Sequence, residues 1–161
     1  MNKSLPELER PEFSEQEATP SLEEHYGLCC TLEELPGERD RNYLAREHNG
    51  ESYVLKISNS CETLEFLKVQ NNALESAAML LEKGRIPSVY PNKNGELLSR
   101  IRSTKGSLHW MRLVHYVDGL PMAEYRPHTR EFLLELGAMC GTVTKALHKI
   151  PLRALDRRLL W

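Results

Sequence analysis

No stretch of this sequence is apolar for anything near the roughly 20 residues that a membrane-spanning helix requires. The first residues, MNKSLPELERPEFSE, are charged and lack the apolar segment of a secretory signal. The formal net charge is −2, so no overall positive field attracts nucleic acid or an anionic membrane. We therefore expect a cytoplasmic protein that binds neither nucleic acid nor membranes.

Cysteine is also scarce, and its spacing excludes two common roles. The four cysteines are Cys29, Cys30, Cys61 and Cys140, and no Cys-x-x-Cys occurs. A disulfide framework or a zinc site needs regular pairs, so we expect neither. Free thiols in a reducing cytoplasm fit this pattern.

The remaining composition suits one domain of ordinary size with a buried core. The chain has 161 residues, of which 40% are apolar and 27% are charged.

A capping box, Ser14 with Glu17, predicts a helix that ends near Gly27. Pro20 lies inside it and predicts either a kink or a helix that restarts there.

Alternation and turn residues predict the other elements. Strands are expected at 29–35, 43–48, 51–57, 87–91 and 107–117, and helices at 62–82 and 129–150, the last ended by Pro151. Asn49-Gly50 between the second and third strands is a strong hairpin signal. Strands joined mainly as hairpins predict a mostly antiparallel, five-stranded sheet and an α+β fold.

The stretch GESYVLKIS, residues 50–58, places a cation in the middle of a strand. Because side chains alternate, Tyr53, Leu55 and Ile57 share one face, and Val54 and Lys56 share the other. Taken alone, this pattern favours a half-solvated face from which Lys56 reaches water. Within the apolar stripe of the next helix, Gln70 is an amide that needs a partner. Either Lys56 supplies one, or Gln70 lies at the edge of the stripe and is hydrated.

Two further stretches are weaker signals. WMRLVHYV followed by DGLP, residues 110–121, places an apolar strand before a glycine break, where the backbone at His115 and Val117 is free to pair with a planar base. The loop PGERDRN, residues 36–42, is able to turn backbone N–H groups toward phosphates. Since it holds one glycine and no G-x-G-x-x-G, its plain interpretation is a surface turn.

Seven blocks of sequence together resemble the N-terminal lobe of the aminoglycoside phosphotransferase and choline kinase-like superfamily, which is related to the protein kinases. The nearest types are hydroxylysine kinase and the phosphotransferase domain fused to class III aminotransferases. The blocks run in order from residue 10 to residue 161: RPEFSEQEA, HYGL, LPGERDRN, YVLKIS, KVQNNALE, MRLVHYVDGLPMAE and ALDRRLLW.

The resemblance implies an ATP site with magnesium and a small-molecule hydroxyl acceptor, either hydroxylysine or another amino alcohol or an aminoglycoside. Lys56 stands where the superfamily's strand lysine pairs with the α- and β-phosphates. Val54 would lie under the adenine, and His115 to Val117 would be the hinge that pairs with the base. The loop contacts to phosphate would be Gly37 and Asn42. Gln70 falls where many kinases carry the glutamate that orients the lysine, with Glu65 and Glu75 as alternatives in another register.

The catalytic loop that the superfamily requires does not occur in these 161 residues. It reads His-Gly-Asp followed by Asn, with a further Asp that holds magnesium. The aspartates here are Asp40, Asp118 and Asp156, and none follows His-Gly. We interpret Asp118-Gly119 as a turn, so no catalytic residue and no metal ligand is assigned.

The resemblance also divides the chain into three parts. Residues 1–27 form an N-terminal extension and helix, 28–117 a kinase-like nucleotide-binding lobe, and 118–161 a hinge and the start of an incomplete helical lobe. The expected partners are that missing lobe or a fused aminotransferase. Three interpretations stay open: the ATP-binding portion of a small-molecule kinase, inactive alone; a non-catalytic regulatory module or degenerate gene remnant; and an interaction domain in which Lys56 is merely solvated.

Overall fold

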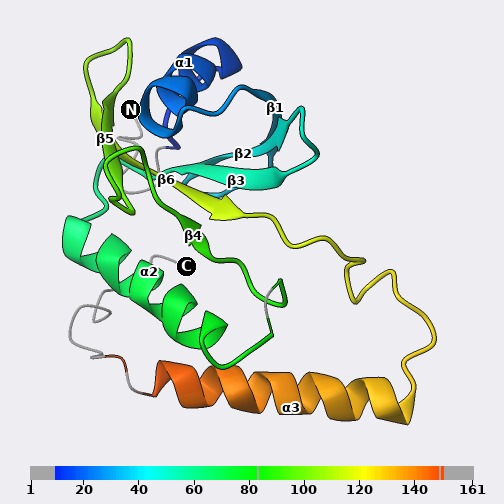
Figure 1. Cartoon of the computed structure of the whole chain (residues 1–161). Helices are drawn as coiled ribbons and strands as arrows, with labels where there is room; N and C mark the ends of the chain where they lie inside the picture. The colour runs from blue at the N-terminus through cyan, green and yellow to red at the C-terminus, as the bar shows by residue number, and fades with distance from the viewer. Residues whose placement is uncertain (1–9, 83, 149, 151–161) are drawn as a thin grey trace, which may run out of the picture. The chain divides into compact units, whose positions relative to one another are not determined.

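The computed structural model describes residues 10–82, 84–148 and 150, and its regular elements are three helices and one antiparallel sheet (Figure 1). The helices are α1 (Glu15–Tyr26), α2 (Leu64–Ala78) and α3 (Arg130–Leu147). The strands are β1 (Cys30–Leu35), β2 (Arg41–Glu47), β3 (Ser52–Ile57), β4 (Val89–Tyr90), β5 (Ser99–Arg102) and β6 (Leu108–His115). The predicted α+β class is confirmed. None of the helices in the described part is both long and apolar enough to cross a membrane.

The strand order is β1-β2-β3-β6-β4, with β5 paired to β6, and every pairing is antiparallel. The expectation of five strands was therefore one short, because β5 was missed. This strand alternates buried Ser99 and Ile101 with exposed Arg100 and Arg102, so its apolar signal is a single isoleucine. Arg100 lies over the ring of Trp110 at 4.9 Å, which gives this outward arginine a favourable neighbour.

The chain forms two compact units. The first comprises the residues up to Leu64 together with Val89–Tyr116, and it holds α1 and the whole sheet. The second comprises Glu65–Ser88 and the residues from Val117 onward, and it holds α3 and all of α2 except its first residue.

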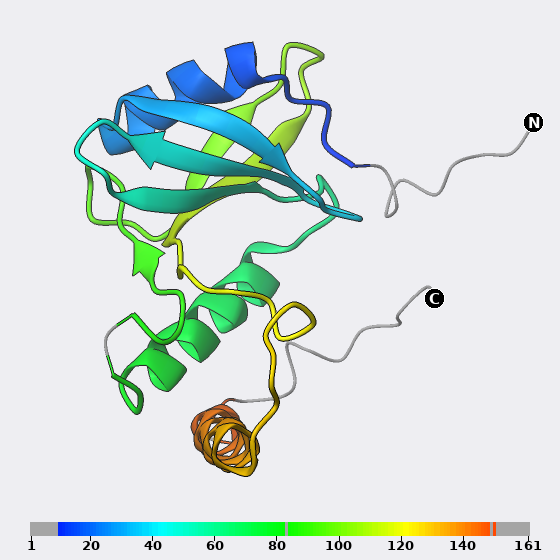
Figure 2. The ribbon, with the colours of Figure 1, turned by 90° about the vertical axis from the view of Figure 1, so that its right-hand side faces the viewer.

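In the first unit, α1 covers one face of the sheet (Figure 2). Ala18, Leu22 and Tyr26 are buried in one core cluster with side chains of β2, β3 and β6. The predicted capping box is present, and Gly27 ends the helix with φ of 72°, a conformation that disfavours any residue with a Cβ. Pro20 does not interrupt α1, so the expected restart is wrong, and the proline lies on the exposed side.

The turn that joins β2 to β3 confirms the hairpin predicted from Asn49-Gly50. Gly50 has φ of 94°, and the side chain of Asn49 accepts a hydrogen bond from the backbone N–H of Glu51 at 2.8 Å. This turn fixes the register in which Asn42 of β2 lies opposite Lys56 of β3.

In the second unit, α3 confirms the helix predicted at 129–150. Thr129 caps it by accepting a hydrogen bond from the backbone N–H of Phe132 at 3.1 Å. Leu133, Leu134 and Leu147 on this helix are exposed. Pro151, and the block ALDRRLLW that begins at residue 154, lie outside the described residues.

Candidate functional site

Lys56 lies on the face of β3 that points away from the core. Along β3, Tyr53, Leu55 and Ile57 are buried, while Val54 and Lys56 between them are partly exposed, so the predicted alternation is confirmed. The Nζ of Lys56 donates a hydrogen bond to Oδ1 of Asn42 at 2.8 Å. Burial lowers the pKa of Lys56, and the positive charge of Arg112 adds to that effect, while the carboxylate of Asp40 opposes it. Lys56 is therefore a partly desolvated, hydrogen-bonded cation rather than a side chain that simply reaches water.

Asn42 links this lysine to the loop between β1 and β2. Its side chain is 8% exposed, and its Nδ2 donates to the backbone carbonyl of Pro36 at 3.2 Å. A Cβ at Gly37 would come within 2.5 Å of both Nδ2 of Asn42 and the carbonyl oxygen of Asp40. Only glycine permits this approach. The structure thus brings Gly37, Asn42 and Lys56, three of the predicted site residues, into one contiguous group.

Arg112 is a second buried cation beside Lys56, and the sequence reasoning missed it. It lies opposite Lys56 in the β3–β6 register and is 5% exposed. Burial lowers the pKa of its guanidinium, while the carboxylates of Asp40 and Glu62 favour the charged form. The available signal was an arginine inside an otherwise apolar strand, WMRLVHYV, the same kind of signal that Lys56 gave.

Acidic partners and main-chain bonds fix the loop above these cations. Oδ1 of Asp40 accepts a hydrogen bond from the backbone N–H of Asn59 at 3.3 Å. Arg39 and Glu62 form an ion pair at 3.2 Å in which the Glu62 side chain is 9% exposed. On the other side of the loop, Arg10 donates to the carbonyl oxygens of Asp40 and Leu35, each at 3.2 Å.

This group holds several charges close together. Its cations are Arg39, Lys56 and Arg112, and its carboxylates include those of Asp40 and Glu62. Like charges in a partly desolvated setting repel more strongly than in water. An anion that accepts hydrogen bonds from Lys56 and Arg112 would therefore be stabilised here, and the phosphate groups of a nucleotide meet that description.

Apolar residues adjoin Lys56 on the same face of the sheet. Val54 pairs with Leu44 on one side and with Val114 on the other. Leu44 and Val114 are 4% and 5% exposed, whereas Val54 is partly exposed. Contact with a planar ring is the role that the resemblance implies for Val54. The chain thus offers apolar and cationic groups on successive positions of one sheet face.

The remaining predicted residues stay predictions. His115 ends β6, and its ring packs at 5.2 Å from Tyr53 and 5.5 Å from Tyr90, which is a structural role in its own right. Val117 is the first residue of the later segment of the second unit. Gln70 belongs to α2 in that same unit and is partly exposed. The amide of α2 that is buried is the neighbouring Asn71, at 2% exposure.

Among the described residues, no group of three or more His, Cys, Asp or Glu side chains is arranged to hold a metal ion. Cys29, Cys61 and Cys140 are exposed free thiols, and Cys30 is a buried one. The group around Lys56 therefore contains cations, the carboxylates of Asp40 and Glu62, the amide of Asn42 and apolar side chains.

The fold defines the structural class. An antiparallel sheet with three helices matches the kinase-like N-terminal lobe of aminoglycoside-phosphotransferase-type structures. The structure of amicoumacin kinase hAmiN in complex with AMP-PNP, Ca²⁺ and Ami aligns with a TM-score of 0.70 and 14% identity, over 92% of this chain and 45% of that one. A microcompartment-associated aminopropanol kinase aligns with a TM-score of 0.61 and 14% identity, over 88% of this chain and 43% of that one.

The sequence adds a particular relative. Hydroxylysine kinase of Danio rerio is 26% identical over 162 residues, which span 94% of this chain and 45% of that protein. No family model matches the sequence. The chain is thus distantly homologous to hydroxylysine kinase, and it spans less than half the length of the relatives it matches.

Proposed function

We propose that this chain is the ATP-binding portion of a small-molecule phosphotransferase that acts on a hydroxyl group. The observation that carries the proposal is the contact of Lys56 with Asn42 beneath the loop at Gly37. In this proposal Lys56 and Arg112 bind the phosphate groups, and the loop at Gly37 covers them. Val54 contacts the base, and Gln70, His115 and Val117 keep the roles that the resemblance gives them.

The residues present fit a nucleoside triphosphate. The adjacent cations Lys56 and Arg112 favour an anion, and the absence of a side chain at Gly37 leaves the loop backbone close to the site. When bound, ATP supplies the phosphoryl group and Mg²⁺ neutralises its charge. What this chain contributes is binding and orientation. The hydroxyl acceptor, with hydroxylysine as the first candidate, rests on the name of the relative.

The test is a thermal-shift titration with MgATP and with adenosine as the ligand without phosphates. Saturating MgATP should raise Tm by several degrees, since a ligand at about 100 times its Kd contributes about 2.7 kcal/mol. Lys56→Met should abolish the shift. Lys145→Met, which removes an exposed lysine of α3, should keep it. An equal shift with adenosine, or a shift that survives in Lys56→Met, would contradict a phosphate site at Lys56.

We expect the 161-residue chain to transfer no phosphate by itself, because its sequence has no His-Gly-Asp motif to accept the proton of a substrate hydroxyl. The measurement is phosphorylation of hydroxylysine by the purified chain with MgATP, followed by mass spectrometry of the products. Turnover that Lys56→Met removes would show that residues of this chain replace the usual catalytic aspartate.

A non-catalytic binding module is the second candidate, and the exposed leucines of α3 favour it. Leu133, Leu134 and Leu147 are 49%, 63% and 42% exposed. Such side chains on one helix are typical of a surface that contacts another protein or another domain. Co-purification with a separate protein that supplies a helical lobe and restores hydroxylysine phosphorylation would indicate a split enzyme. A stable partner without any transfer activity would indicate a regulatory module.

A further inference from the structure

A polar hollow lies beneath the β5–β6 hairpin in the first unit, apart from the residues assigned to nucleotide. We call it the hairpin pocket. Its volume is about 420 Å³, within the usual range for small-molecule sites. The side chains that matter are Arg10, Ser60, Ser103, Lys105, Ser107 and His109.

Each of the three serines brings one hydroxyl donor to the hairpin pocket. Ser103 is 7% exposed, and its Oγ accepts a hydrogen bond from the backbone N–H of Ser107 at 3.1 Å. That bond leaves the hydroxyl proton of Ser103 to donate. Within residues 10–82, 84–148 and 150, this proton and the hydroxyls of Ser60 and Ser107 have no acceptor. A ligand rich in acceptor oxygens would satisfy them.

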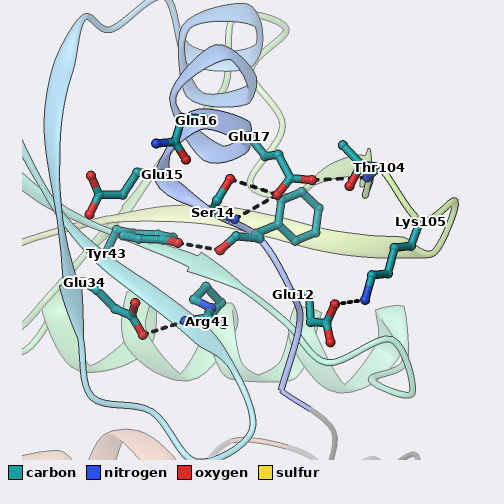
Figure 3. Close-up of a pocket in the computed structure, with 11 residues that line it drawn as sticks. Glu12, Ser14, Glu15, Gln16, Glu17, Glu34, Arg41, Tyr43, Thr104 and Lys105 are labelled. Carbon is teal, nitrogen blue, oxygen red and sulfur yellow. Dashed lines mark hydrogen bonds and ion pairs between the residues drawn. The ribbon is translucent and has the colours of Figure 1, made fainter.

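Two cations, Arg10 and Lys105, line the hairpin pocket, and they differ in how many partners hold their side chains. Arg10 is held by the carbonyl oxygens of Leu35 and Asp40 and by an ion pair with Glu34 at 2.9 Å, so part of its planar fork of donors is oriented before any ligand arrives. Lys105 pairs with Glu12, as Figure 3 shows. Both side chains of that pair are about 70% exposed, so the pair is weak and Lys105 is able to exchange partners.

His109 lines the hairpin pocket with a buried polar ring that two neighbours hold in position. It is 6% exposed, its ring meets Phe13 edge-on at 5.3 Å, and its Nδ1 lies 3.0 Å from the carbonyl oxygen of Ser58. A carbonyl only accepts, so Nδ1 carries the proton, and Nε2 of the neutral ring is an acceptor. A phosphate monoester is able to serve both kinds of group, because its anionic oxygens accept from serine and cation donors and its protonated form offers one O–H.

Hydrogen bonds hold the tip of the β5–β6 hairpin in place. The carboxylate of Glu17 in α1 accepts a hydrogen bond from the backbone N–H of Thr104 at 3.3 Å (Figure 3). The backbone N–H of Ser103 donates to the carbonyl oxygen of Ser107 at 2.9 Å. Ser103 and Lys105 therefore lie on a turn that is closed by a backbone hydrogen bond and is bonded to Glu17 of α1. The fold therefore defines the shape of the hairpin pocket.

We propose that the hairpin pocket binds a small phosphate monoester through Ser103, Lys105 and Arg10. This site is separate from the one proposed for nucleotide, and it stands whether or not Lys56 binds ATP. Glu12 then acts as an internal competitor, since its carboxylate occupies Lys105 until a phosphate group replaces it.

The test is calorimetric titration of the full chain with glycerol 3-phosphate, with glycerol and glycerate as probes without a phosphate group. We expect saturable binding of glycerol 3-phosphate, and weak or no binding of the other two. The same affinity in Lys56→Met would separate this site from the nucleotide site. Lys105→Ala should weaken binding by about tenfold, the typical effect of losing one charge-assisted hydrogen bond, and Lys145→Ala should not.

Glu12→Gln is the sharpest variant, because it removes the competing carboxylate and leaves the donors unchanged. We expect it to tighten binding several-fold, which a purely structural role of Glu12 would not produce. The proposal is overturned by an absence of saturable binding in the wild-type chain, by loss of binding in Lys56→Met, by equal binding of glycerate, or by indifference to both Lys105→Ala and Glu12→Gln.

Discussion

At the residue scale, a lysine in the middle of a strand is costly unless its ammonium ion finds partners, and Lys56 has one in Asn42. The amide oxygen of Asn42 lies 2.8 Å from Nζ, and its nitrogen holds the loop at Pro36. A neutral amide stabilises the ammonium ion without neutralising it, so the positive charge stays available to a ligand. In kinases the partner of the strand lysine is usually a carboxylate, whereas here Lys56 bonds to the amide of Asn42. Because Asn42 also bonds to Pro36, the position of Lys56 is linked directly to that of the loop.

Asn42→Asp tests this relation, because it replaces one heavy atom, the amide nitrogen, with oxygen and adds a negative charge beside Lys56. A carboxylate would pair with the ammonium ion and repel phosphate groups, so we expect the affinity for MgATP to fall by at least about tenfold while the chain still folds. Calorimetric titration measures the affinity, and circular dichroism checks the fold.

The matched control is Asn49→Asp, which adds the same charge in the exposed β2–β3 turn, where Asp is also able to accept the hydrogen bond from Glu51. We expect its affinity for MgATP to equal that of the wild type. Equal loss in both variants would indicate a general charge effect instead of a local one at Lys56.

Part of this site follows from sequence and part does not. The face of Lys56 follows from strand alternation, and the loop at Gly37 follows from its place between two strands. The contact of Asn42 with Lys56 depends on the register that the Asn49-Gly50 turn sets. Arg112 could not be placed from its own sequence, because its position beside Lys56 depends on the pairing of β3 with β6, which are separated by 50 residues.

At the scale of elements, α1 shows how a local motif acquires a longer-range role. Glu17 closes the capping box by accepting from the backbone of Ser14, and it also bonds to Thr104 in the β5–β6 hairpin. These bonds, with that from the backbone of Ser14 the largest cause, lower the pKa of Glu17 from 4.5 to about 2. The first link follows from Ser14 and Glu17 in the sequence, whereas the second required the fold.

The lowered pKa predicts how stability depends on pH. Between about pH 4.5 and about pH 2, the unfolded chain binds a proton at Glu17 that the folded chain does not. The stabilisation is therefore present above pH 4.5 and is lost on acidification through this window. Glu17→Gln keeps an acceptor but loses the charge, so it should be less stable by about 0.3–1 kcal/mol at pH 6 and equal to wild type near pH 2.

Urea unfolding at several pH values measures this difference. Glu15→Gln is the matched control, since Glu15 lies in the same first turn of α1 and accepts no hydrogen bond within the described residues. We expect this variant to show little change. A stability difference for Glu17→Gln that stays constant from pH 6 to pH 2 would contradict the role given to the ionised carboxylate.

Elements with strong local signals were predictable, and those with weak signals were not. The capping box, the Asn49-Gly50 turn and the alternation of β3 each give more than one agreeing signal. By contrast, β5 is four residues long with two outward arginines, and it is a strand because β6 pairs with it. Pro20 was expected to disturb α1, yet tertiary packing of Ala18, Leu22 and Tyr26 keeps the helix continuous.

At the scale of the whole molecule, the chain combines a well-cored unit with a second unit that exposes apolar side chains. Leu120, Leu133 and Leu134 of the second unit are 71%, 49% and 63% exposed. The relatives that the chain matches are more than twice as long. Both facts agree with the proposal that this chain is one portion of a phosphotransferase.

In the proposed function, Lys56 and the loop at Gly37 bind the phosphate groups of a nucleotide. The most direct measurement is a titration of the ¹⁵N-labelled chain with MgATP, followed by ¹H–¹⁵N correlation spectra. We predict saturable shifts at the amides of Gly37, Asn42 and Lys56 in the wild type, and none of these shifts in Lys56→Met. Spectra that do not change with MgATP, or shifts that persist in Lys56→Met, would contradict the claim.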